Sequence, residues 1–420
     1  MQASRPDRPW LPLGVRRLTD VVSESLARAL SRPPVAVLVV AAMVAVSLAF
    51  GLHGLATPLR TDYLAMLTGA RVLGGGGCLY CVGAQVQAQS ALFGVRTGAF
   101  DPFLETPIVA LAYRPLLGLP PSAGFAVFLG LSAGSIAAAA ALAWRRLGLG
   151  GLGPPGAALL ALTLVSLPAA WNYQLGQVDS LLVLSLVGGT VLLAAGRRWG
   201  AGLLLSLLLL KPQTVWLLPL ALLLVGEWRV VAGMVIGGAC LAGASLLLVG
   251  VAGIDQWLSL LGGRGPAVAT SYGLPGAIAS LGGNGAGFVA AAVLGLIACG
   301  WVWRHRRGLA GRPLSVLALG VAGSLLLAPH VYVYDMIMVV VPLAVLARRS
   351  LPAALVAALL LNAAYLVDTY FIYAGPHLEA LALCVIVGLL AVDALVRAPA
   401  AAVPAGTVQL PVVSSTTTGA

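Results

Sequence analysis

Charged side chains are scarce in this chain and make up 9% of its 420 residues. Soluble globular domains carry about 25% charged residues, so the composition excludes that class. Hydrophobic residues reach 60%, and the mean hydropathy is +1.00. The apolar runs are solid Leu, Val, Ala and Gly, without the polar–apolar alternation of barrel strands. The sequence therefore predicts an all-α polytopic membrane protein.

Lysine is almost absent, because all 24 basic residues are arginine except Lys211. The net charge of +11 would suggest nucleic-acid binding in a soluble protein. Here the arginines stand between apolar runs, so they indicate membrane topology and surface charge instead. No nucleic-acid partner is predicted.

Cysteine is also rare, and five residues are too few for a disulfide framework. Cys78 and Cys81 fall in a predicted outer loop, where they form either a local disulfide or two unpaired thiols. The other three lie in apolar runs and are predicted to be inert core thiols: Cys240, Cys299 and Cys384.

Signatures of several soluble catalytic sites are missing. The GGGG stretch at 74–77 has no following Gly-Lys-Ser/Thr and no preceding strand, so it is no phosphate-binding loop. No cluster has the spacing of a metal site, and no Ser-His-Asp set or nucleotide-binding domain is recognised. We therefore predict no metal and no cofactor, and find no obvious means of using ATP or a nucleotide sugar.

The apolar runs predict about 10–12 transmembrane helices, several of them shorter than the ~20 residues of a perpendicular crossing. They are 35–53, 122–143, 155–170, 178–196, 200–211, 213–226, 230–251, 286–303, 313–328, 334–347, 350–366 and 378–396. Arginines fall on alternate connections, which places those connections and both termini in the cytoplasm. The predicted organisation is a basic cytoplasmic segment at 1–34, a transmembrane domain at 35–396 and a disordered cytoplasmic tail at 397–420.

The opposite connections form one outer face that holds nearly all the polar chemistry. They are 54–121, 171–177, 211–213, 252–285, 329–333 and 367–377. The first is long, and its prolines predict short interfacial helices instead of another crossing. The concentration of polar residues on one predicted face of the membrane is the main indication of function.

Asp62 follows the first apolar run and stands between Arg60 and Tyr63, close behind the membrane boundary. An aspartate before an amphipathic stretch is commonly a helix N-cap. A carboxylate at this place can also serve as a general base. The spacing leaves both hypotheses open.

Lys211 lies inside the strongly apolar stretch LLLLKPQTVWLLPL. Charge in such a place is costly, so the lysine predicts a functional site with a phosphate or anionic headgroup as its partner, helped by Gln213. Snorkelling of the side chain to the surface is the alternative.

Two further segments of the outer face carry uncharged amides or a histidine. WNYQLGQVDS contains Gln174 and Gln177, which suit recognition of sugar hydroxyls or headgroups, although an interfacial anchor explains its aromatic residues equally well. APHVYVYD contains His330 and Asp335, and such a histidine binds a phosphate, relays a proton or merely caps a loop.

Several segments, in this order, resemble the patterns of one known family. They are TDYLAMLTGARVLGGGGCLY, FDPFLETPIVALAYRPLLGLP, LGQVDSLLVLSLVGGTVLLA with GAGLLLSLLLLKPQTVWLLPLALLL, and APHVYVYDMIMVVVPLAVL. The chain resembles glycosyltransferase family 87, the polyprenyl-phosphate-sugar-dependent membrane transferases of the GT-C class, over about residues 35–396. Arg114 and Cys81 depart from the family's pattern.

The resemblance implies a GT-C fold with a long first extracytoplasmic loop, in a multi-pass protein of the cell membrane. It implies transfer of a hexose, usually mannose, from a polyprenyl-phosphate donor to a lipid or glycan acceptor on the outer face. Asp62 would be the catalytic base, and Lys211, His330 and Arg60 would bind the donor phosphate. Substrate contacts are predicted for the other polar candidates of this face: Gln174, Gln177, Asp335, Gln213 and Tyr63.

Two other classes of function compete with this prediction. A transporter or flippase would carry ionisable residues along a path through the midplane and internally repeated halves. The charges instead crowd one face, and no clear repeat is found. A non-catalytic scaffold for envelope assembly is the third class, and it predicts no dependence on Asp62.

Overall fold

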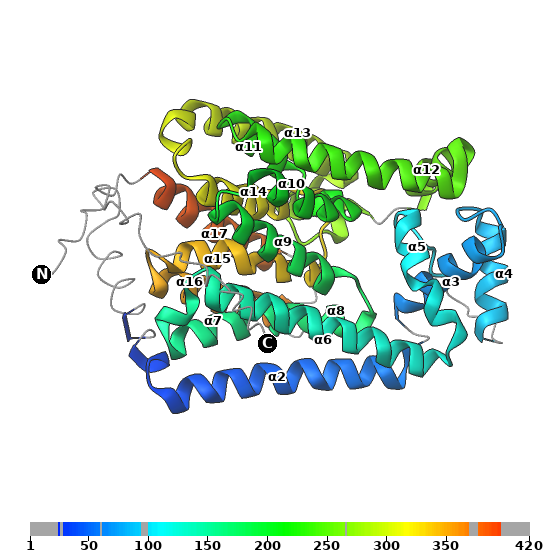
Figure 1. Ribbon diagram of the computed structural model, residues 1–420, viewed down its shortest axis with the longest axis horizontal. Helices are drawn as coiled ribbons and strands as arrows, with labels where there is room; N and C mark the ends of the chain where they lie inside the picture. The colour runs from blue at the N-terminus through cyan, green and yellow to red at the C-terminus, as the bar shows by residue number, and fades with distance from the viewer. Residues whose placement is uncertain are drawn as a thin grey trace, which may run out of the picture.

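The computed structural model describes residues 24–25, 28–58, 61–93, 100–264, 267–368 and 377–395. All secondary structure in these ranges is helical, and no strand occurs there (Figure 1). The predicted tail at 397–420, most of the basic segment at 1–34, and Arg60 lie outside the described residues.

Proline marks the beginning of many helices, where its fixed φ and missing N–H cost nothing. It stands in the first turn of α2 (Pro33–Ala56), α6 (Pro121–Arg146), α7 (Pro154–Leu164), α14 (Pro313–Leu327) and α16 (Leu351–Val367). The beginnings of these helices are thus marked by a local sequence signal.

Among the described residues, five helices are long and apolar enough to cross a membrane. They are α2, α6, α12 (Trp228–Arg264), α13 (Leu274–Leu309) and α17 (His377–Leu395). Shorter apolar helices are α9 (Asp179–Ala194), α10 (Arg198–Leu205) continued by η4 (Ser206–Leu210), α14, η7 (Val333–Val339) continued by α15 (Val340–Ala347), and α16. The protein is therefore a multi-pass, all-α membrane protein, and the number of crossings stays a prediction.

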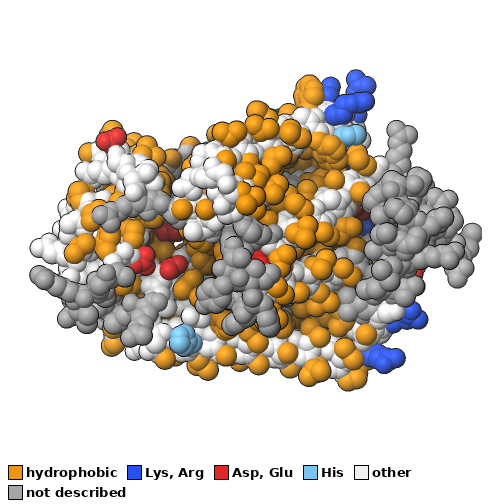
Figure 2. Space-filling model, turned by 180° about the vertical axis from the view of Figure 1, so that it is seen from behind, with side chains coloured by type: hydrophobic (Ala, Val, Ile, Leu, Met, Phe, Trp, Pro, Cys, Tyr) orange, Lys and Arg blue, Asp and Glu red, His pale blue; other side chains and the backbone are white. Residues whose placement is uncertain are grey.

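The surface distribution of side chains suits a lipid environment. Leu247 is 90% exposed and Leu281 91% exposed, which only an apolar surrounding favours. Figure 2 shows hydrophobic side chains across the middle of one face and Lys and Arg at one end. We call this the arginine-rich end; α6 finishes there with Arg145 and Arg146.

The described parts of the long connection 54–121 fold into short helices at the opposite end of the molecule (Figure 1). They are α3 (Tyr63–Gly74), α4 (Val82–Phe93), α5 (Pro107–Tyr113) and the 3-10 helix η2 (Arg114–Gly118). The prediction of short helices without another crossing is confirmed.

One disulfide and one hydrogen-bonded side chain hold this connection together. Cys78 and Cys81 form a disulfide between α3 and α4, so the first of the two sequence hypotheses is confirmed. The buried Gln85 amide donates to the carbonyl of Leu79 at 2.8 Å and accepts from the N–H of Phe103 at 2.9 Å. Because both the oxygen and the nitrogen of this amide are hydrogen-bonded, the side chain holds the backbone at Phe103 against α4.

The breaks in two long helices agree with predicted boundaries of apolar runs, whereas the prediction for one thiol is wrong. Most of the predicted outer loop 252–285 is helical, because α12 runs on to Arg264 and α13 already begins at Leu274. Each of these two elements is broken at a glycine near a predicted boundary: Gly250 lies next to the predicted end at 251 and Gly283 near the predicted start at 286. Their φ values of 69° and 82° are a conformation that favours glycine. Cys240 is exposed and is not a core thiol, since it stands on an apolar surface.

Glycine also permits the closest approach between helices α10 and α12. A Cβ added at Gly202 would lie 2.0 Å from the carbonyl oxygen of Val230 and 2.9 Å from Cα of Gly233. Small residues allow backbones to touch where no hydrophobic effect drives helices together in lipid.

We expect Gly202→Ala to lower the free energy of unfolding by about 1–3 kcal/mol, because the added methyl group overpacks this contact. Thermal unfolding of the purified protein measures the change. Gly243→Ala, in the partner helix α12, is the control, since nothing lies within 4 Å of its new Cβ. Equal melting temperatures for the two variants would contradict the close approach.

Candidate active site

The junction between α8 (Leu167–Leu175) and α9 turns on Gly176. This residue ends α8 with φ 77° and ψ 34°, and its N–H bonds to the carbonyl of Asn172. The left-handed conformation is the usual helix C-cap, which glycine adopts without strain. It directs the next residues, Gln177 and Asp179, into the interior, where their exposed fractions are 3% and 0%.

Lys211 occupies a break between η4 and the 3-10 helix η5 (Pro212–Thr214). Pro212 disfavours a helical conformation at the preceding residue, and Lys211 has φ −127° and ψ 72°. The break falls inside the predicted connection 211–213, whose place on the outer face stays a prediction. The side chain does not snorkel, because only 3% of it is exposed.

The buried ammonium of Lys211 has two carboxylate partners. Its Nζ lies 2.7 Å from Oδ2 of Asp179 and 3.4 Å from Oδ1 of Asp335. It also lies 4.5 Å from the ring centre of Tyr334, within cation–π range. An unpaired buried charge is strongly destabilising, so these contacts explain why the lysine is tolerated here.

Asp335 is fixed in turn by the beginning of η7. Its Oδ2 accepts from the N–H of Tyr332 at 2.7 Å, as one half of a capping box. Oδ1 remains for Lys211. The carboxylate therefore joins a helix end to the ammonium with both of its oxygens used.

Lys211 also determines how the Gln177 amide is oriented. Its Nζ donates to Oε1 of Gln177 at 3.0 Å. Because an ammonium has no acceptor, the amide oxygen must face Lys211 and the amide nitrogen must face the other way. That nitrogen donates to Oδ2 of Asp62 at 2.5 Å.

Five side chains are joined in this way, and we call them the Lys211 network: Asp62, Gln177, Asp179, Lys211 and Asp335. They come from four separate parts of the chain. The result is a connected path of hydrogen bonds from a buried ammonium to a half-buried carboxylate.

Asp62 precedes α3 at its N-cap position, but its side chain makes no cap hydrogen bond. Burial raises the pKa of its carboxyl above the ordinary value, while the Gln177 hydrogen bond and the charge of Lys211 lower it. The N-cap hypothesis is therefore wrong for the side chain. A carboxylate with a raised pKa accepts a proton more readily, which is a property that a general base needs.

Other carboxyl groups adjoin the network, and the sequence did not single them out as site residues. Burial and the charge of Asp62 raise the pKa of Asp101 to about 7. Burial also raises the pKa of Glu105, while the charge of Lys211 lowers it. The signal for both is the motif FDPFLET, where two acids stand in an apolar stretch. Asp179, two residues after Gln177, was likewise missed.

His330 is not joined to the Lys211 network by a hydrogen bond or ion pair among the described residues. Its ring packs edge-on against Phe288 with centroids 5.8 Å apart. Burial lowers the pKa of the imidazole, so it is less readily charged. Its predicted phosphate contact stays a prediction.

The remaining candidates have different surroundings. Tyr63 has no exposed surface and packs against Tyr113, Phe125 and Phe128, so a substrate contact would require its ring to leave this aromatic core. Gln174 and Gln213 are partly buried. In the described ranges, no three His, Cys, Asp or Glu side chains are arranged to hold a metal ion.

The sequence profile of glycosyltransferase family 87 matches residues 103–329, more than half of the chain. The chain belongs to glycosyltransferase family 87. The match includes Gln177, Asp179 and Lys211, begins after Asp62 and ends one residue before His330. Comparison with curated proteins and with solved structures finds no match.

Family membership makes the chain a multi-pass membrane glycosyltransferase and confirms the resemblance found in the sequence. It favours a transferase over the transporter and scaffold classes. A sugar donor and an acceptor are therefore its substrates.

We expect Gly176→Ala to destabilise the protein by more than the ~1–2 kcal/mol of a left-handed alanine. Its Cβ would also lie 2.9 Å from Cβ of Tyr63 and 3.1 Å from the Phe125 ring. Gly148→Ala is the control, since Gly148 has φ 80° with nothing within 4 Å. If thermal unfolding gives both variants the same loss, the contact with Tyr63 is unimportant.

Proposed function

We propose that this glycosyltransferase moves a hexose, mannose in the first instance, from polyprenyl phosphate to a hydroxyl of a lipid or glycan acceptor. The reaction takes place at the extracytoplasmic face of the cell membrane, in a GT-C type of fold. The observation that carries the proposal is the Asp62 carboxylate, which is oriented by Gln177 beside the first membrane helix.

Asp62 acts as the general base. Its carboxylate takes the proton of the acceptor hydroxyl while that oxygen forms a bond to the anomeric carbon. The bond between this carbon and the phosphate oxygen breaks, and the electron pair leaves with polyprenyl phosphate. A single displacement inverts the anomeric configuration, so a β-linked donor gives an α-linked product.

Gln177 and Lys211 prepare Asp62 for this step. The Gln177 amide occupies Oδ2, which leaves Oδ1 for the acceptor. Lys211 has oxygen partners in Asp179, Asp335 and Gln177, so contact with a phosphate would require it to give one up. We therefore assign Lys211 a positioning role and propose His330 and Arg60 for the phosphate.

The charge balance supports this division. The carboxyl groups that interact with Lys211 outnumber the single ammonium: Asp62, Glu105, Asp179 and Asp335. The carboxylates of Asp179 and Asp335 that face the ammonium would repel a donor phosphate placed beside it. Binding beside His330, outside the Lys211 network, avoids that repulsion. Gln174 and Gln213 are then left for sugar or acceptor hydroxyls.

We expect Asp62→Asn to lower the rate of transfer by about 10²–10⁴-fold, the range of a lost general base. The measurement follows radiolabel from polyprenyl-phosphate-mannose into lipid or glycan in membranes that contain the protein. Asp255→Asn is the matched control, because Asp255 is an exposed acid of α12.

The two parts of the proposal fail differently in this assay. Equal transfer by wild type and Asp62→Asn would show that Asp62 is not the base. No transfer by wild type from this donor, with transfer from another sugar donor, would overturn the donor class instead.

The pH dependence of transfer tests the role of Gln177. Asp62 must be ionised, so activity falls as pH drops through its raised pKa. The Gln177 hydrogen bond lowers that pKa. Gln177→Met should therefore raise it further and move the acidic limb of the kcat/KM profile to higher pH.

This variant leaves both partners of the Lys211 ion pairs, Asp179 and Asp335, in place, so we expect the fold to be preserved. Asp255→Asn should keep the wild-type profile. An acidic limb that stays in place, or moves to lower pH, would refute the positioning of Asp62 by Gln177.

A further inference from the structure

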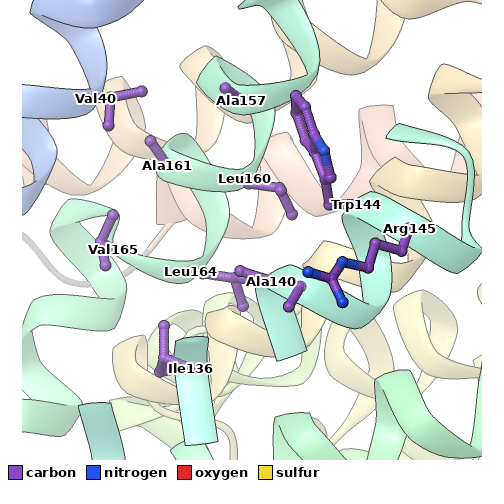
Figure 3. Close-up of a pocket in the computed structure, with 11 residues that line it drawn as sticks. Val40, Ile136, Ala140, Trp144, Arg145, Ala157, Leu160, Ala161, Leu164 and Val165 are labelled. Atoms are coloured by element: carbon purple, nitrogen blue, oxygen red, sulfur yellow. The ribbon is translucent and has the colours of Figure 1, made fainter. Parts of the chain in front are cut away.

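A groove of about 380 Å³ opens between α2, α6 and α7 (Figure 3). Its walls are apolar, and small side chains create the space: Ala140 and Ala141 from α6, and Ala157 and Ala161 from α7. Alanines at facing positions leave room that larger residues would fill. The groove is thus a built-in recess of the lipid-facing surface.

One cation and one indole stand at the end of this apolar groove. Trp144 and Arg145 belong to the last turn of α6, and both are exposed. Figure 3 shows the guanidinium of Arg145 directed along the groove toward Ala140. No ion pair involving Arg145 is found in the described part of the chain. Tryptophan is typical of the membrane interface, so the polar end of the groove lies at headgroup level.

The length of the groove matches one leaflet. Ile136 and Arg145 are the outermost α6 residues of its lining, and their separation corresponds to ~14 Å at 1.5 Å per residue. Half of the hydrocarbon core of a bilayer is about 15 Å. An acyl chain from the leaflet at the arginine-rich end therefore fits the groove from its mouth to its end.

The candidate active site lies at the other end of α6. There a Cβ on Gly124 would lie 2.5 Å from the Tyr63 hydroxyl oxygen, and Tyr63 directly follows Asp62. The distance from Gly124 to Arg145 along the helix is ~32 Å. The groove is thus separate from the site of transfer.

We propose that this groove binds an anionic phospholipid, with its phosphate on Arg145 and one acyl chain between α6 and α7. The polyprenyl tail of a donor fits less well, because it is uncharged and would leave Arg145 without a partner. A second copy of the chain would have to bury the Arg145 charge, for which the described residues supply no ion-pair partner. The anionic lipid satisfies both the apolar walls and the cation.

The test is titration of the purified full-length protein with dioleoylphosphatidylglycerol or dioleoylphosphatidylcholine, followed by native mass spectrometry. Wild type should bind the anionic lipid about five-fold more tightly, as expected for one basic residue near the membrane surface. Arg145→Gln should abolish this preference. Arg146→Gln is the charge-matched control and should retain it, because Arg146 does not line the groove.

A second pair of variants tests the apolar wall. Ala141→Leu fills the groove and should weaken binding of both lipids, whereas Ala137→Leu adds the same bulk at an exposed α6 position outside it. Melting temperatures without added lipid control for folding. Equal affinity of wild type for both lipids, or equal losses in Arg145→Gln and Arg146→Gln, would overturn the proposal. So would a change of oligomeric state in Ala141→Leu with lipid binding intact.

Discussion

The pairing of one buried ammonium with two carboxylates is the interaction on which the rest of this structure depends. Lys211 joins the start of α9, through Asp179, to the start of η7, through Asp335. Removing one member of such a buried set typically costs about 3–5 kcal/mol, because the other charge is left uncompensated. The same ammonium orients the Gln177 amide and, through it, Asp62. Stability and the geometry of the candidate base therefore rest on the same atoms.

Much of the fold follows from local sequence signals. Each predicted apolar run coincides with a helix or a pair of helices. A run of consecutive apolar residues is a local signal, because a backbone in lipid must satisfy its hydrogen bonds within the same segment. Prolines marked helix beginnings, and the Lys211-Pro212 break was visible as a charge followed by proline. The connection 252–285 was recognised from its glycines and polar residues, and the structure adds that much of it is helical, in the parts of α12 and α13 between the breaks at Gly250 and Gly283.

The candidate site was only partly visible in the sequence, for a physical reason. Asp62, Gln177, Lys211 and Asp335 were singled out individually, since polar residues beside apolar runs attract attention. Their partnership was not, because Lys211 reaches Asp335 across 124 residues and Gln177 reaches Asp62 across 115. No local pattern encodes such contacts. Tyr63 stood beside a candidate base in the sequence, yet its ring belongs to an aromatic core.

The solitary lysine has a practical consequence for chemistry on the protein. Lys211 carries the chain's single side-chain amine, and the folded structure encloses it among carboxylates, an amide and a tyrosine ring. An amine-directed reagent reaches this atom only when the surrounding helices separate. Covalent labelling of Lys211 would therefore report, at one defined position, the opening of the region that holds Asp62.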